Sequence, residues 1–160
     1  MFFNSAMIAQ AGKILQKLRE KNLKISTAES CTGGLVSALF TSVPGSSDVF
    51  ERGFVTYSNE AKIEMLGVNA EVIKNFGAVS AEVAKEMAAG ALKNSKADIA
   101  IAITGIAGPQ SDDTKKPVGL VFIAVATKEK IIVRKFNFSG DRNEVRKASI
   151  IAALEMINLF

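Results

Sequence analysis

Apolar and polar residues follow two periods along the chain, one typical of helices and one typical of strands. Met7, Ala11, Ile14 and Leu18 recur at helical spacing and predict an amphipathic opening helix over about residues 4–21. Short apolar runs predict strands over residues 23–27, 53–57, 98–104, 118–127 and 131–138. Further helices are predicted over residues 34–41, 59–66, about 70–76, from a Ser80 cap to 93, and from Asp141 to about 159.

Boundary signals support these elements. Ser58 and Ser80 are good N-caps, and Gly77 is a helix stop. Asp141 with Glu144 three residues later is typical of a capping box. A short charged turn between the last two strands predicts an antiparallel hairpin. Strands alternating with helices predict a three-layer α/β/α fold with a mixed, mostly parallel sheet and one late antiparallel hairpin.

Length and composition add to this picture. We expect the 160 residues, 48% of them apolar and 22% charged, to form one domain, residues 1–160. The longest apolar run, residues 118–126, is too short to span a membrane and is interpreted as a buried strand, so we expect no membrane partner. The N-terminus lacks the features of a signal peptide, and a single cysteine cannot form an internal disulfide. These features favour a cytoplasmic location.

The charge pattern suits a small anion at least as well as a nucleic acid. Twenty basic and sixteen acidic residues give a net charge of +4, and the basic residues are scattered rather than clustered. Most of the ten phenylalanines lie in apolar strand or helix patterns. A basic nucleic-acid binder needs clustered arginines with interleaved aromatics, so we expect no nucleic-acid partner.

The segment Thr27–Gly34 holds the strongest candidate chemistry. Ser30 lies where a strand gives way to a helix, and the amides of Thr32, Gly33 and Gly34 could approach an oxyanion. The chain has no histidine, and neither Gly-x-Ser-x-Gly nor Ser-x-x-Lys occurs around Ser30. A serine nucleophile would therefore need a lysine, tyrosine or carboxylate partner. Two alternatives stay open: Ser30 or Thr32 caps the helix, or Cys31 is the nucleophile or a packed apolar neighbour.

Tyr57 and Lys62 could supply that partner. Tyr57 ends a predicted strand and Lys62 lies near the start of the next helix, so both reach one sheet edge if the strand is parallel to residues 23–27. Burial and the helix N-terminus would both lower the pKa of such a lysine, which it needs in order to act as a base near neutral pH. The alternative is a solvated lysine on a helix surface.

Two further segments could bind a ligand. The loop Thr104–Pro109 follows a buried strand, and its glycines would let the backbone approach a ligand, although an ordinary tight turn fits equally well. Arg142, at the start of the last helix, could bind a phosphate or pair with surface carboxylates. Without histidine and with one cysteine, no metal site is expected.

Six segments together resemble the C-terminal domain of the CinA family, which also occurs as a stand-alone nicotinamide-nucleotide amidohydrolase. The matching runs, in order and over nearly the whole chain, are residues 27–34, 50–62, 77–80, 104–109, 116–119 and 138–142. Many family members carry a larger N-terminal domain linked to nucleotide-pyrophosphatase activity. This chain has no room for such a domain, so we expect that activity to be absent.

The resemblance implies hydrolysis of the carboxamide of nicotinamide mononucleotide to nicotinate mononucleotide and ammonia. It implies Ser30 as the nucleophile, Lys62 as its base and Tyr57 assisting between them, without metal or cofactor. It also places Thr104, Gly105, Ala107, Gly108 and Arg142 near the phosphorylated substrate, and it suggests a homo-oligomer. The alternative is a non-catalytic nucleotide-binding or regulatory module.

Overall fold

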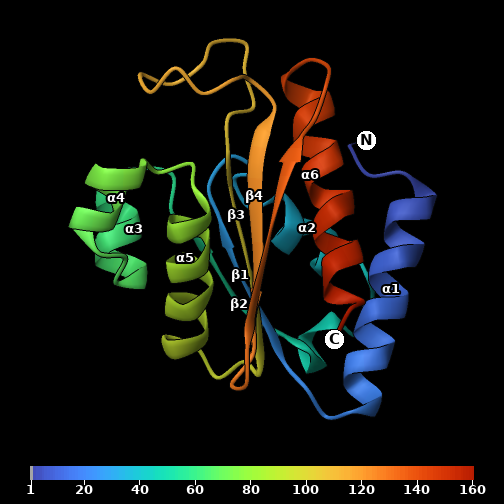
Figure 1. Cartoon of the computed structure of the whole chain (residues 1–160). Coiled ribbons are helices and arrows are strands. Elements are labelled where there is room, and N and C mark those ends of the chain that lie inside the picture. Colours follow the sequence, from blue (N-terminus) through green and yellow to red (C-terminus); the bar gives the residue numbers. More distant parts are fainter. Residues whose placement is uncertain (1) are drawn as a thin grey trace.

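The computed structural model, described here for residues 2–160, is a five-stranded sheet with α-helices on both faces (Figure 1). The strands are β1 (Ile25–Glu29), β2 (Phe50–Val55), β3 (Ile99–Gly105), β4 (Leu120–Ala126) and β5 (Ile131–Asn137). The helices are α1 (Ser5–Glu20), α2 (Leu35–Thr41), α3 (Asn59–Leu66), α4 (Ala70–Phe76), α5 (Ala81–Lys93) and α6 (Arg142–Ile157), with a 3₁₀ turn at Ser46–Asp48.

The sheet has the strand order β2-β1-β3-β4-β5. Strand β1 pairs in parallel with β2 and β3, whereas β4 pairs antiparallel with both β3 and β5. The predicted three-layer α/β class and the late hairpin are confirmed. Besides forming the hairpin with β5, β4 also pairs antiparallel with β3. Because β1, β2 and β3 run in the same direction, the segments that follow their carboxyl ends meet at one edge of the sheet.

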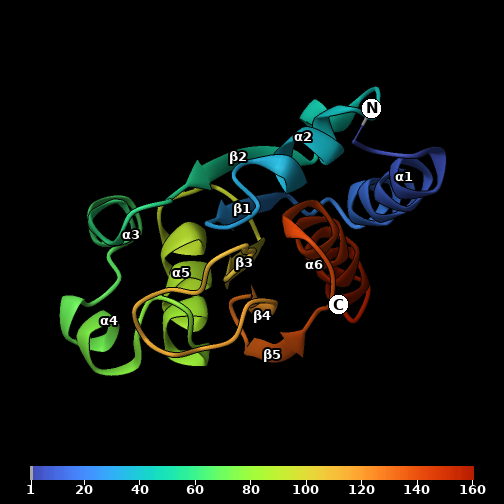
Figure 2. The same ribbon diagram turned by 90° about the horizontal axis from the view of Figure 1, so that it is seen from above.

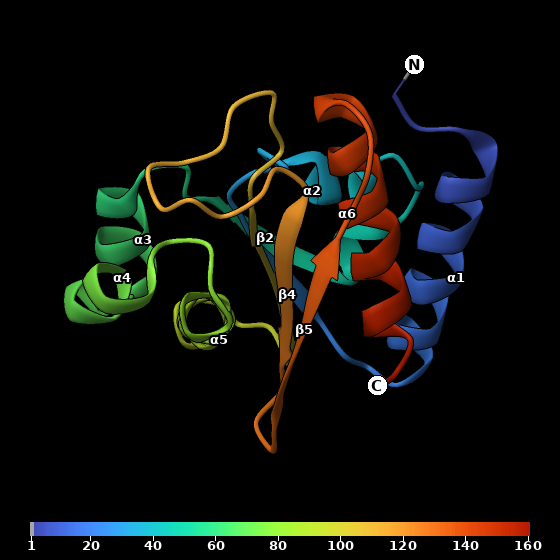
Figure 3. The same cartoon turned by 45° about the horizontal axis from the view of Figure 1, so that its top comes forward.

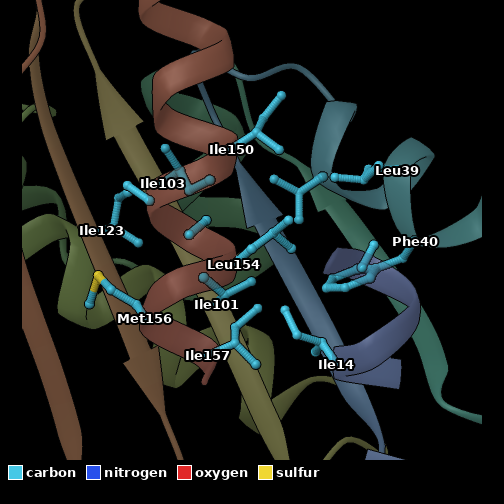
Figure 4. Packing of buried hydrophobic residues seen from close by; sticks show 14 of the residues in the cluster. Ile14, Leu39, Phe40, Ile101, Ile103, Ile123, Ile150, Leu154, Met156 and Ile157 are labelled. Atoms are coloured by element: carbon cyan, nitrogen blue, oxygen red, sulfur yellow. The ribbon is translucent and has the colours of Figure 1, made fainter. Parts of the chain in front are cut away.

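The two faces of the sheet carry different residues. On one side lie α1, α2 and α6, and on the other lie α3, α4 and α5 (Figure 2). In β3, isoleucines contribute to the cluster beneath α1, α2 and α6, while alanines contribute to the cluster beneath α5. The small alanine side chains let α5 lie close to the sheet, and the larger aliphatic side chains fill the opposite layer (Figure 4).

Most predicted elements occur within two residues of their expected bounds. The helix bounds 59–66 and 70–76 agree with the structure, and both halves of the Asp141–Glu144 capping box are present. The largest differences are in β1 and β2. Strand β1 continues to Glu29, and β2 begins at Phe50 and ends at Val55. Polar residues near the ends of these strands interrupt the apolar pattern, so the pattern does not show where the strands begin and end.

Two mid-helix glycines offer a matched test of the packing. A Cβ at Gly90 of α5 would lie 2.0 Å from the Leu66 carbonyl oxygen, so Gly90→Ala must push α3 and α5 apart. We expect it to lower the free energy of unfolding by about 1–3 kcal/mol. A Cβ at Gly12 of α1 meets nothing nearer than 3.8 Å. Gly12→Ala should raise stability by about 0.5–1 kcal/mol through helix propensity. Urea denaturation of both variants measures the contrast, and equal effects would contradict it.

Candidate active site

Ser30 follows the carboxyl end of β1 and is held in a tight turn. Its N–H donates to the Ile103 carbonyl at 3.0 Å, and its carbonyl accepts from the Gly33 N–H at 3.0 Å. The side chain is only 8% exposed. The backbone around the hydroxyl is therefore fixed by the adjacent strand and by the turn.

Glu29, rather than Ser30 or Thr32, satisfies the first amides of α2. Its fully buried carboxylate accepts from the Val36 N–H at 2.8 Å and from the Ser37 N–H at 3.1 Å. It also accepts from the Ser37 hydroxyl at 2.8 Å. A carboxylate at this end complements the helix dipole and replaces the usual N-cap side chain. The capping interpretation of Ser30 is therefore wrong, and its hydroxyl is left for another partner.

That partner is Lys62 of α3, whose side chain is almost fully buried. Its Nζ lies 3.0 Å from Ser30 Oγ, 2.8 Å from the Thr56 carbonyl oxygen and 3.3 Å from the Tyr57 carbonyl oxygen. The two carbonyls follow β2, and the Ser58 cap starts α3 so that Lys62 points back at them. The interpretation of Lys62 as a solvated surface lysine is therefore wrong.

The three oxygens around Nζ can satisfy either form of the amine, and burial favours the neutral one. Burial lowers the pKa of Lys62 from its ordinary value of 10.5 to about 8. A neutral amine has two N–H donors and one lone pair. In the ammonium form Nζ donates to Ser30 Oγ and to both carbonyls, and in the neutral form its two N–H bonds can go to the carbonyls, which leaves the lone pair for the Ser30 hydroxyl. A neutral amine in this position can accept a proton from the serine hydroxyl.

Cys31 lies next to Ser30, but its surroundings make its thiol a poor nucleophile. Its thiol is buried, and burial raises its pKa to about 12. A thiol with that pKa remains protonated near neutral pH and is a poor nucleophile. The structure thus favours the reading of Cys31 as a packed neighbour.

Tyr57 requires a correction to the expected arrangement. Its side chain is 62% exposed, and its hydroxyl accepts from Arg142 Nη2 at 3.1 Å. Only its backbone carbonyl contacts Lys62. The phenol does not lie between Ser30 and Lys62, because the amine already contacts the serine directly.

Ser30 and Lys62 open onto a pocket of about 270 Å³ at the carboxyl edge of the parallel strands. The loop after β3 forms one wall, and the connection from this loop to β4 passes over the same edge between α3 and α6 (Figure 3). Arg142 of α6 also lines the pocket and fixes that wall by donating to the Gly108 carbonyl at 2.7 Å. The sequence-predicted residues that line it are Ser30, Tyr57, Lys62, Thr104, Gly105, Ala107, Gly108 and Arg142.

The predicted amides of Thr32, Gly33 and Gly34 lie elsewhere. Within the described chain these residues do not line the pocket, and the Gly33 N–H is already used by the Ser30 carbonyl. Ala107 and Gly108 do line it, and their N–H groups have no acceptor within residues 2–160. The loop after β3 thus offers donors that could approach a ligand in the pocket, in addition to any from the Ser30 turn.

Several residues of the site were missed or given another role. Arg146 donates to the Cys31 carbonyl at 3.1 Å and to the Thr32 carbonyl at 3.3 Å, which ties the Ser30 turn to α6. Asn59 and Asp112 line the pocket without having been predicted. No spacing rule links these residues to Ser30, because only the tertiary fold brings them together. The polar loop 110–116 was the sole signal that could have indicated Asp112.

No metal-binding cluster accompanies this pocket in the part of the chain that the structure describes. Among residues 2–160 no three histidine, cysteine, aspartate or glutamate side chains gather closely enough to hold an ion. The charged side chains that line the pocket are Lys62, Asp112 and Arg142. None of the described helices is long and apolar enough to cross a membrane.

A buried serine–lysine pair at the carboxyl edge of a mixed sheet defines an α/β protein with a hydrolase-like site. The family model of the CinA C-terminal domain matches residues 8–160, and the chain belongs to this family. It is 47% identical over 155 residues to the nicotinamide-nucleotide amidohydrolase PncC of Escherichia coli, covering 96% of this chain and 94% of that protein.

Other relatives carry less specific names. A putative competence-damage inducible protein of Caldicellulosiruptor saccharolyticus is 58% identical over 90% of this chain, but the match spans only 35% of that protein's length. The crystal structure of the competence/damage inducible protein CihA from Agrobacterium tumefaciens superposes with a TM-score of 0.95 at 43% identity, covering 98% and 96% of the two chains. The family resemblance and the fold expected from it are thus confirmed.

Proposed function

We propose that the protein hydrolyses the carboxamide of nicotinamide mononucleotide, releasing nicotinate mononucleotide and ammonia. The observation that carries this proposal is the 3.0 Å contact between Lys62 Nζ and Ser30 Oγ in a pocket. The name and near-full-length match of the Escherichia coli relative support the choice of substrate.

The reaction begins when Ser30 Oγ attacks the amide carbon and Lys62 Nζ accepts the hydroxyl proton. The resulting ammonium lies beside the developing leaving group and returns the proton to the amide nitrogen, so that the C–N bond breaks and ammonia departs. Water then attacks the acyl-serine and loses a proton to Lys62. The bond between the acyl carbon and Ser30 Oγ breaks, Lys62 returns the proton to Oγ, and nicotinate mononucleotide leaves with both side chains restored. The direct contact supports Lys62 rather than Tyr57 as the base nearest Ser30.

The tetrahedral intermediate needs donors for its oxyanion. Ala107 and Gly108 line the pocket and their N–H groups have no acceptor within residues 2–160, whereas the Gly33 N–H is used by the Ser30 carbonyl. Preorganised amides in a site shielded from water stabilise such charge at no reorganisation cost. We therefore place the oxyanion against the loop after β3, in place of the Thr32–Gly34 turn.

Arg142 is suited to the phosphate end of the substrate. It lies at the mouth of the pocket, where its guanidinium bonds to Gly108 and to the Tyr57 hydroxyl. A planar guanidinium held in this way favours phosphate recognition. Tyr57 then shapes the mouth of the pocket and orients Arg142.

The test of this function is ammonia release from nicotinamide mononucleotide, with nicotinamide and glutamine as control amides. We expect release from the nucleotide and little from either control, which lacks the phosphate. Tight binding of the nucleotide without product over long incubation would instead support a non-catalytic binding module.

The pH dependence should report the state of Lys62. Because the base must be neutral, kcat/KM should rise with pH up to about 8, following the pKa of Lys62, and then level off. Below that pH we expect about a tenfold fall for each pH unit. Steady-state assays between pH 6 and 9.5, with a stability check at each pH, measure this profile. A flat profile across this range would contradict Lys62 as the base.

A further inference from the structure

We propose that the positive ring nitrogen of a pyridinium substrate itself drives Lys62 into its neutral, basic form, so that the site selects amides carried on a cationic ring. This inference rests on the proposed function. Binding of the positive ring favours loss of the Lys62 proton, so the substrate itself generates the neutral amine that acts as the base.

The immediate surroundings of Lys62 make it sensitive to an added charge. Its Nζ contacts a hydroxyl and two backbone carbonyls, all neutral, and no ion pair is recorded for it among residues 2–160. Lys62 is 1% exposed, so solvent screens a charge near it less than it would screen one at the protein surface. No carboxylate pairs with Nζ, so no ion pair holds Lys62 in its protonated form when a positive charge approaches.

Other ionisable groups lie near the pocket, and hydrogen bonds fix the positions of most of them without removing the charges of Asp112 and Arg142, which are the same with and without a ligand. On β1 and its turn, the Glu29 carboxylate accepts from α2, and the Cys31 thiol is neutral. On α6, Arg142 and Arg146 donate to backbone carbonyls. The Tyr57 hydroxyl accepts from Arg142, Asp112 of the loop accepts from Thr114, and Glu60 of α3 is exposed.

Attack by Ser30 requires the substrate ring to lie close to Lys62 Nζ. Ser30 Oγ must reach the amide carbon, and in a nicotinamide ring the charged nitrogen is only a few bonds from that carbon. Two unit charges some 7 Å apart in a partly buried site change an ionisation constant by roughly tenfold or more. Because linkage is reciprocal, protonated Lys62 weakens binding of the cationic ring by the same factor.

Binding to the Ser30→Ala variant isolates this effect, because that variant should bind without turnover. Calorimetry at pH 7.5 in two buffers of different ionisation heat counts the protons released. We expect nicotinamide mononucleotide to release about half a proton more than its reduced form, whose ring is uncharged and whose phosphate is the same. In Ser30→Ala/Lys62→Met the difference should vanish.

The wild-type enzyme supplies a second readout. The apparent pKa in kcat, which reports the substrate complex, should lie about one unit below that in kcat/KM, which reports the free enzyme. Equal proton release by the two ligands, or coincident profiles, would overturn the inference while leaving the hydrolase assignment intact. Absence of ammonia release by the wild type would instead defeat the proposed function and this inference with it.

Discussion

Ser30→Ala should lower kcat for ammonia release from nicotinamide mononucleotide by about four to six orders of magnitude, the scale seen when a serine nucleophile is removed. The reason is that Ser30 Oγ is the hydroxyl in direct contact with Lys62 Nζ. The fold should be unaffected, because the hydroxyl does not cap α2 and the Ser30 backbone bonds remain.

Cys31→Ala is the matched control for this variant. The thiol is adjacent in sequence and lines the same pocket, but burial raises its pKa to about 12. We expect its activity to stay within about tenfold of the wild type, since only packing is lost. If Cys31→Ala abolished ammonia release and Ser30→Ala retained it, the nucleophile would be the cysteine.

Lys62→Met should also lower kcat by several orders of magnitude, because the hydroxyl then has no base in contact. Methionine matches the length of the lysine stem and has no ionisable group. The free energy of unfolding should fall by no more than about 1–3 kcal/mol, because relief of the buried charge offsets part of the cost of leaving the Thr56 and Tyr57 carbonyls without a donor.

Two comparisons make the loss at Lys62 interpretable. Lys62→Arg keeps a positive charge but cannot deprotonate near neutral pH, so it should be as inactive as Lys62→Met. Lys85→Met removes an exposed lysine from α5 and should leave kcat unchanged. Steady-state ammonia release, with thermal unfolding of each protein, measures both. Activity of Lys62→Arg near that of the wild type would rule out proton transfer by this side chain.

Much of the fold follows from local signals in the sequence. The helix α3 has a Ser58 cap, and α6 has a complete capping box, so their starts could be predicted from neighbouring residues alone. The bounds of β1 were harder to predict, because Glu29 is buried through hydrogen bonds to α2 rather than through apolar character. From the sequence alone, a charged residue at this position is interpreted as the start of a turn, because the amides that bind its carboxylate are not apparent.

Some residues of the candidate site could likewise be predicted from the sequence, and others could not. Ser30 could be singled out because it lies between a strand and a helix pattern, and Lys62 because it lies in the next strand–helix unit. The position of the Tyr57 phenol could not be predicted, because a residue's direction at a strand end depends on where the chain turns. The sequence also could not show that the Gly33 amide is used by the Ser30 carbonyl, because that bond depends on the conformation of the turn.

The most direct test of the account is to trap the acyl group on the enzyme with hydroxylamine. If Ser30 forms an ester with the nicotinate nucleotide, hydroxylamine competes with water for it and yields the hydroxamate. We predict hydroxamate from the wild type, in proportion to hydroxylamine, and none from Ser30→Ala. Undiminished ammonia release with no hydroxamate at any concentration would mean that water attacks the amide directly, which would contradict Ser30 as the nucleophile.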